Sequence, residues 1–200
     1  MSGNHMPEQP AVDRRVQRSR AALMAAAVRL VSERGTTALP VAEFTEAANV
    51  SRKLLYMHFG DRDGLLVAAA IDLVERELLP RTVEMDGDLR EHVLATVRHF
   101  AEHRPFYRPM LTGPCAFAMT TKQNSLLGSL SRDTVRDVYG DLEQQTLNDL
   151  ALVITSGVSA VVNDWLINAD DPLDPDAMTD RLQRMASALI NSRSGGGRVR

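Results

Sequence analysis

Hydrophobic residues recur at helical spacing along almost the whole chain, and no segment alternates convincingly between apolar and polar positions as a strand does. The clearest stripe lies within residues 13–34, at i, i+4, i+7 and i+8, and consists of Leu23, Ala27, Leu30 and Val31. Helix-breaking positions then divide the chain at Gly35, Pro80, Gly87, Pro105, Gly113-Pro114, Gly140 and residues 170–175. The pattern therefore predicts an all-α fold of about nine helices.

Two short helices separated by a tight turn are expected after the first helix. Pro40 suits the first turn of the second helix, Asn49 tolerates the left-handed conformation of a turn, and Ser51 is a good N-cap for the third helix. On the third helix, Leu55 and Phe59 lie at i and i+4 and should face the core. The opposite face then carries Arg52, Lys53, Leu54 and Met57. Two such helices predict a helix-turn-helix, whose second helix enters the major groove of DNA.

Several short motifs in this region resemble those of the tetracycline-repressor (TetR) family of bacterial regulators. They are Glu33-Arg34-Gly35, Ala48-Asn49-Val50-Ser51, Tyr56-Met57-His58-Phe59 and Arg62-Asp63-Gly64-Leu65-Leu66. The resemblance covers roughly residues 14–75, and beyond it only the helical rhythm is similar. Asn49 stands where the family usually has a turn glycine, and Leu54 where a small residue or threonine is common.

The resemblance implies roles for individual residues. Arg52, Lys53 and Leu54 would face base edges, and the residues that would contact phosphates are Ser51, Tyr56, His58 and Arg62. A basic segment in the first helix would reach the DNA backbone or an adjacent minor groove, through Arg14, Arg15, Arg18 and Arg20.

The resemblance also implies two domains, a helix-turn-helix DNA-binding domain at residues 12–62 and a helical ligand-binding and dimerisation domain at residues 63–192. Residues 1–11 and 193–200 are expected to be flexible tails. Apolar seams on a helix over residues 142–166 and on the last helix predict a four-helix bundle between two subunits. The dimer contacts would come from Ile154, Val158, Val161, Leu182 and Met185.

Residues 84–140 are expected to form a chamber for a small apolar or amphipathic effector. Its lining would come from Phe100, Phe106, Met110, Phe117, Met119 and Trp165. The predicted protein is a homodimeric repressor that the effector releases from a palindromic operator in double-stranded DNA. The alternative is a regulator controlled by a protein partner, or by its own concentration, without a small ligand.

Charge separates the two parts of the chain. Residues 1–62 hold nine Lys and Arg against six Asp and Glu, whereas residues 63–200 hold fourteen against twenty. This asymmetry indicates that only the first part contacts a polyanion. A single cysteine, no signal-peptide pattern and no continuous stretch near the about 18 apolar residues of a membrane span predict a cytoplasmic protein without a membrane partner.

We expect no enzyme activity and no cofactor, because the chain has no glycine-rich phosphate loop, nucleophile elbow or zinc-protease spacing. His92, His99 and His103 share one helical stripe, and the pair His99 and His103 at i and i+4 has metal-binding spacing. Solvent-edge histidines are the commoner explanation, so no metal site is assigned, and an enzyme using this stripe is the remote alternative. Cys115 is interpreted as a buried, inert thiol, although a position near a helix start would favour a thiolate.

Overall fold

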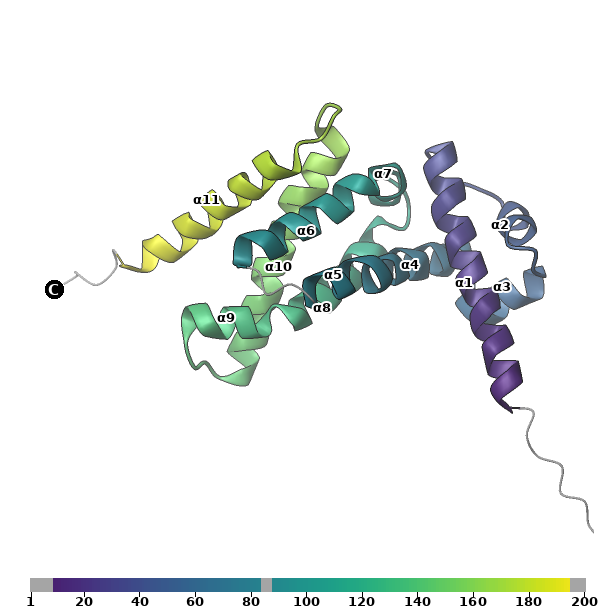
Figure 1. Ribbon diagram of the computed structural model, residues 1–200, viewed down its shortest axis with the longest axis horizontal. Coiled ribbons are helices and arrows are strands. Elements are labelled where there is room, and N and C mark those ends of the chain that lie inside the picture. Colours follow the sequence, from purple (N-terminus) through teal and green to yellow (C-terminus); the bar gives the residue numbers. More distant parts are fainter. Residues whose placement is uncertain (1–8, 84–87, 195–200) are drawn as a thin grey trace, which may run out of the picture.

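The computed structural model describes residues 9–83 and 88–194, and within these ranges it contains helices and no strand (Figure 1). The first half contains α1 (Gln9–Arg34), α2 (Val41–Ala47), α3 (Arg52–Phe59), α4 (Arg62–Leu73), a π-helical turn (Val74–Leu78) and α5 (Leu79–Val83). The second half contains α6 (Leu89–Glu102), α7 (Arg104–Thr112), α8 (Ala116–Leu130), α9 (Arg132–Tyr139), α10 (Gln144–Asn168) and α11 (Pro175–Ser194). The all-α prediction is therefore confirmed.

The helix boundaries differ from the prediction mainly at Pro80, where a break was expected. The chain instead continues from α4 through the π-helical turn into α5 without a break. With this continuous stretch counted once, the described residues form ten separate helices, where about nine were predicted. Pro80 lies just after the π-helical turn, at whose end the Leu79 amide donates to the Val74 carbonyl, so the irregular hydrogen bonding there accommodates a residue without an amide hydrogen. Most of both predicted flexible tails lies outside the described residues, but residues 9–11 and 193–194 belong to the first and last helices.

Short polar side chains cap several helices as the sequence chemistry requires. Asp61 accepts a hydrogen bond from the Gly64 amide at 2.7 Å and starts α4. Asp88 accepts one from the Glu91 amide at 3.0 Å and starts α6. Each cap pairs one of the backbone N–H groups that a helix start leaves without a partner.

The main hydrophobic core extends from the first helices into the second half of the chain, and a smaller cluster lies between α9 and α10. The predicted stripe on α1 is buried in it, as are Phe44 from α2 and Leu55 from α3. α4 lies between the two parts, because it packs against α1 and α3 at one end of the molecule and against α8 further along (Figure 1). Movements of α4 relative to α6 to α8 would therefore reach the first three helices.

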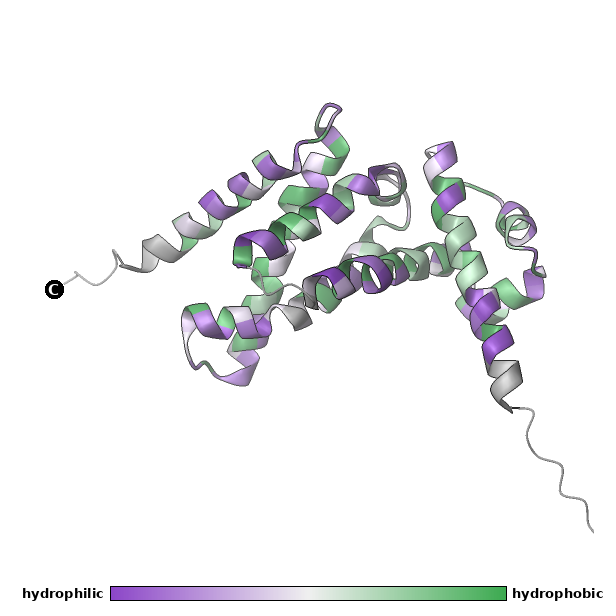
Figure 2. Cartoon of the chain, viewed as in Figure 1, coloured by the Kyte–Doolittle hydropathy of each residue, from purple (hydrophilic) through white to green (hydrophobic). Residues whose placement is uncertain are grey.

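The long helix α10 packs against α6, α7, α8 and α9, whereas α11 lies along α6 at the opposite end of the molecule from α1 (Figure 1). Figure 2 shows apolar residues concentrated where these helices meet and polar residues over much of α11. α10 alone among the described helices is long and apolar enough to cross a membrane, with 28% of its most apolar window buried. The sequence analysis found no continuous apolar stretch of this length because isolated polar residues interrupt α10, although the helix is apolar on average. A helix that packs within a helical core passes the same test of length and composition.

Candidate nucleic-acid interface

A tight turn places α3 against α2. Asn49 has a φ of 50°, the left-handed conformation predicted for it, and it is the one described residue other than glycine with a positive φ. The Val50 amide donates to the Thr45 carbonyl at 2.9 Å and closes the turn. Asparagine can therefore replace glycine here without changing the path of the chain.

Ser51 caps α3, because its side-chain oxygen accepts a hydrogen bond from the Leu54 amide at 3.4 Å. Leu55 is fully buried, and this single anchor fixes which face of the helix looks outward. Arg52 and Lys53 are exposed on that outward face, and Tyr56 is 52% exposed. The structure therefore brings Ser51, Arg52, Lys53 and Tyr56 together on one accessible surface.

Two neighbours modify this surface. Leu54 is only partly exposed, so it offers a base edge less apolar area than a fully exposed leucine would. Met57 is 61% exposed and extends the surface, but it was not among the predicted contact residues. Met57 lies four residues after Lys53 and so on the same face of α3, and this spacing could have identified it as a contact residue.

Arg20 holds the C-terminal end of α3 in place. Its guanidinium donates to the His58 carbonyl at 3.1 Å and lies 4.8 Å from the centre of the Phe59 ring. A basic residue expected to reach DNA is therefore engaged within the protein, whereas Arg14, Arg15 and Arg18 are exposed at the polar end of α1 (Figure 2). No pattern in the sequence signalled this contact, which joins residues 38 positions apart.

The structure gives less direct support to the other two predicted phosphate ligands. His58 Nε2 is buried and has no hydrogen-bond partner among the described residues. Arg62 Nε lies 2.8 Å from Asp63 Oδ1, so part of its charge is already neutralised. Both contacts with DNA remain predictions that require these side chains to reorient.

Gly64 sets the distance between α3 and α4. A Cβ atom at this position would lie 2.1 Å from the Phe59 carbonyl oxygen, which is far inside van der Waals contact. Only glycine permits this close approach of the two backbones.

Most predicted chamber-lining side chains lie inside the core. Phe100, Phe106, Met110 and Met119 are buried and Trp165 is partly buried, all in one hydrophobic cluster. Phe117 is a correction, because it is 84% exposed in the first turns of α8 and does not line the interior. The helical period does not reveal which side of α8 faces inward when both sides carry apolar residues.

The predicted dimer contacts divide in a similar way. Ile154, Val158 and Val161 on α10 and Met185 on α11 are partly exposed. Leu182 is 5% exposed and belongs to the core of its own chain, so its expected contact with a second subunit is corrected to a contact within the chain. Sequence reasoning missed Val153 on α10, which is 65% exposed.

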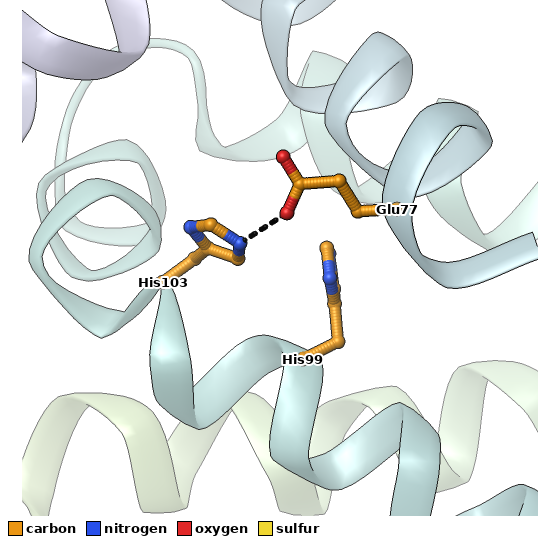
Figure 3. A group of neighbouring side chains, drawn as sticks. All are labelled: Glu77, His99 and His103. Atoms are coloured by element: carbon orange, nitrogen blue, oxygen red, sulfur yellow. Dashed lines mark hydrogen bonds and ion pairs between the residues drawn. The ribbon is translucent and has the colours of Figure 1, made fainter. Parts of the chain in front are cut away.

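Glu77, His99 and His103 form a cluster between the π-helical turn and α6 (Figure 3). His103 Nε2 lies 2.7 Å from Glu77 Oε2, and His99 Nε2 lies 3.1 Å from the Tyr107 hydroxyl oxygen. Burial, followed by the neighbouring His103, lowers the pKa of His99 to about 4, so its ring is neutral near pH 7. The prediction of solvent-edge histidines is wrong for His99, which is fully buried.

Cys115 is 2% exposed, and burial, followed by the nearby charge of Asp63, raises the pKa of its thiol to about 11. A thiol with a raised pKa and no access is a poor nucleophile. Cys115 is therefore buried, as predicted, in surroundings that disfavour the reactive thiolate.

Comparisons with known proteins agree with this geometry. Residues 23–69 match the family model described as "Bacterial regulatory proteins, tetR family". No curated protein is significantly similar to the chain in sequence.

Solved structures share the fold over most of the chain. A putative TetR-family transcriptional regulator from Rhodococcus sp. is similar with a TM-score of 0.62 and 20% identity, over 87% of this chain and 99% of that one. The TetR family repressor AlkX from Dietzia sp. has a TM-score of 0.60 and 18% identity, over 86% and 95%. The fatty acid degradation regulator FadR from Bacillus halodurans has a TM-score of 0.54 and 17% identity, over 89% and 99%. Residues 23–69 therefore match the tetR family of bacterial regulatory proteins, and the chain as a whole is similar in fold to these solved structures.

Proposed function

We propose that this protein is a homodimeric, ligand-responsive repressor that binds a palindromic operator through the outer face of α3. The observation that carries the proposal is the exposed group of Arg52, Lys53 and Tyr56, held outward by the buried Leu55 and the cap at Ser51. A helix fits the major groove, where an arginine can donate two hydrogen bonds to a guanine edge. In this proposal residues 12–62 bind DNA, and residues 63–192 sense the effector and form the dimer.

Dimerisation is proposed through α10 and α11. Val153, Gly157 and Ala160 are exposed on one side of α10 at i, i+4 and i+7. The two smaller residues would let the backbone of a second α10 approach closely. A dimer gives DNA binding two recognition helices, which successive major grooves of a palindrome can accept.

The effector is proposed to be small and apolar or amphipathic, and to bind among the buried aromatic and methionine side chains of α6 to α8. Such a ligand must favour a dimer whose recognition helices are wrongly spaced, and it lowers DNA affinity only by that preference. Control by a protein partner or by concentration remains the second proposal, favoured by how closely Phe106, Met110 and Met119 pack within the core. We propose the cytoplasm as the site of action.

The test is binding of the purified chain to the DNA that flanks its own gene, measured across a salt series. The variant Arg52→Ala/Lys53→Ala is compared with Arg108→Ala/Lys122→Ala, which removes the same two charges from exposed positions on α7 and α8. We expect the first variant to lose at least about 30-fold in affinity, since it removes two base contacts that contribute about 1–3 kcal/mol each. The matched control should stay within about threefold, because nonspecific charge effects away from the interface are small.

Binding of the wild-type chain should also weaken steeply with salt, because phosphate contacts release counterions. Equal losses in both double variants, or no salt dependence, would contradict the assignment of α3 as the recognition helix. A screen for compounds that release the DNA then separates control by a ligand from control by a partner.

A further inference from the structure

The cluster of Glu77, His99 and His103 has the composition of a metal site (Figure 3). We propose that these three side chains bind one divalent transition-metal ion of the zinc class. Two imidazoles and one carboxylate are the ligand set of zinc sites that keep a fourth position open for water. The proposal concerns binding of the ion and does not depend on the proposed regulation of DNA binding.

The distances suit an ion of this class. Each side chain offers one ligand atom, and these three atoms lie within 4.8 Å of one another. Two ligands of zinc, each about 2.1 Å from the metal, can be at most roughly 4.2 Å apart. Small rotations of the side chains are therefore enough to bring all three into the coordination shell.

The burial of the cluster leaves one side accessible. The side chains of His103 and Glu77 are 25% and 29% exposed, whereas His99 is fully buried. An ion can therefore enter from the solvent side and keep a water molecule as its fourth ligand. His99 and His103 lie at i and i+4, which places both rings on one face of the end of α6.

An unpartnered nitrogen at the buried histidine points independently to a ligand. His99 Nδ1 is buried and has no hydrogen-bond partner among the described residues. The other ring nitrogen, Nε2, lies 3.1 Å from the Tyr107 hydroxyl oxygen. Histidines that bind metals usually donate the N–H of their second nitrogen to an oxygen, which fixes the tautomer. With Nε2–H donating to Tyr107, the lone pair of Nδ1 is available to the ion.

The backbone around Glu77 is also unusual. This residue lies in the π-helical turn between α4 and α5, and π-helical turns inside α-helices are frequent at functional sites. An ion would join this turn to the end of α6 through metal–ligand bonds. Without an ion, a hydrogen bond joins Glu77 to His103, and another joins His99 to Tyr107.

Nearby cations do not oppose binding strongly, because carboxylates already pair with them. Arg76 lies 3.6 Å from the second oxygen of Glu77 and 3.4 Å from Asp72. Arg81 lies 3.2 Å from Glu102. The three carboxylates outnumber the two guanidinium groups, so the local charge can accept a dication.

The test uses the full chain, stripped with a chelator and titrated with Co²⁺, whose visible absorption reports tetrahedral coordination. We expect one Co²⁺ per chain, displacement by Zn²⁺, and a higher thermal midpoint in Zn²⁺, because an ion that binds only the folded state stabilises it. The variants Glu77→Gln and His103→Asn are chosen because both side chains are partly exposed and tolerate change better than His99. His92→Asn is the matched control, because His92 lies on the same helix outside the cluster.

Each variant is checked for folding by circular dichroism before titration. We expect Glu77→Gln and His103→Asn to weaken Co²⁺ binding by at least about tenfold and His92→Asn to leave it unchanged. Absence of a one-to-one Co²⁺ spectrum, or an equal loss in His92→Asn, overturns the proposal. X-ray absorption of the zinc-loaded wild-type chain decides the matter if a variant fails to fold. Two imidazole ligands support the site, and sulfur ligation or a single imidazole overturns it.

Discussion

The DNA-binding helices and the last two helices differ in how completely one chain covers their apolar residues. In α1 to α3, most inward apolar side chains are buried, and the outward face of α3 carries the basic Arg52 and Lys53 beside the exposed Met57. On α10, by contrast, Leu152 and Val153 remain 48% and 65% exposed. The first region buries its apolar residues within one chain apart from Tyr56 and Met57 on the outward face of α3, whereas the second leaves apolar area without basic neighbours that another protein surface can cover.

The two regions also differ in how far apart along the sequence their interacting residues lie. Turn residues and caps within a few positions of one another shape α2 and α3. The arrangement of α6 to α11 depends on contacts between residues tens of positions apart. Four substitutions, ordered from the largest expected effect to the smallest, test this contrast.

Gly64→Ala should destabilise the DNA-binding region most. The new Cβ atom would lie 2.1 Å from the Phe59 carbonyl oxygen, so α3 and α4 must separate. We expect a loss of about 3 kcal/mol in the free energy of unfolding, measured by urea denaturation. Gly128→Ala on α8 is the control, because its nearest atoms are 3.8 Å away. Equal stability of the two variants would show that α3 is not packed against α4 as described.

Arg104→Met should have the next largest effect, in the other region. This buried arginine donates to the Leu166 carbonyl at 2.8 Å, and also contacts the Ala169 carbonyl and Asp171. Losing these charge-assisted hydrogen bonds leaves the carbonyls at the end of α10 unpaired, and we expect a loss of about 2 kcal/mol in the free energy of unfolding.

Arg98→Met is the matched control for Arg104→Met. Arg98 pairs with Asp176 on α11 at 3.2 Å, but both side chains are more than half exposed. Exposed pairs contribute at most about 1 kcal/mol. Chemical denaturation that ranks Arg98→Met as the more damaging change would contradict the described attachment of α7 to α10.

Val153→Glu tests whether the exposed face of α10 is covered by a second copy. A buried, unpaired carboxylate should raise the dimer dissociation constant by at least about tenfold, measured by analytical ultracentrifugation. Val138→Glu is the control, since Val138 is also exposed but lies on α9 rather than on α10. If both variants dimerise as the wild-type chain does, the interface lies elsewhere.

Gly157→Ala has the smallest expected effect, but its sign is informative. No atom lies within 4 Å of a Cβ at this position in the single chain. Helix propensity alone would therefore stabilise the variant by about 0.5–1 kcal/mol. Close packing of two α10 helices would reverse the sign in the dimer. Thermal melting at several protein concentrations separates the two cases.

The helix-turn-helix was predictable because its determinants are local. Asn49 in the turn, Ser51 as the cap and the buried Leu55 each depend on neighbours within one or two turns of chain. Once Leu55 faces inward, helical geometry alone decides that Arg52 and Lys53 face outward.

Other features could not be predicted, because they depend on how helices cross. Arg20 became a support for α3 rather than a free cation only when α1 passed the end of that helix. Phe117 was expected in the interior and is exposed, whereas Leu182 was expected at the dimer interface and is buried in its own chain. The sequence could not separate these cases, since an apolar residue suits either a core or an interface.

The sequence by itself determined that the chain is helical, where the turn between α2 and α3 lies, and which face of α3 meets solvent, because these follow from periodicity, turn residues and caps. The tertiary structure alone decided that His99 is buried beside Glu77 and His103, and that α10 keeps apolar area exposed. The i, i+4 spacing of His99 and His103 places the two rings on one face of a helix, but it does not determine which residue of another helix lies beside them. Residues 22 and 26 positions apart meet only when the core between their helices is packed.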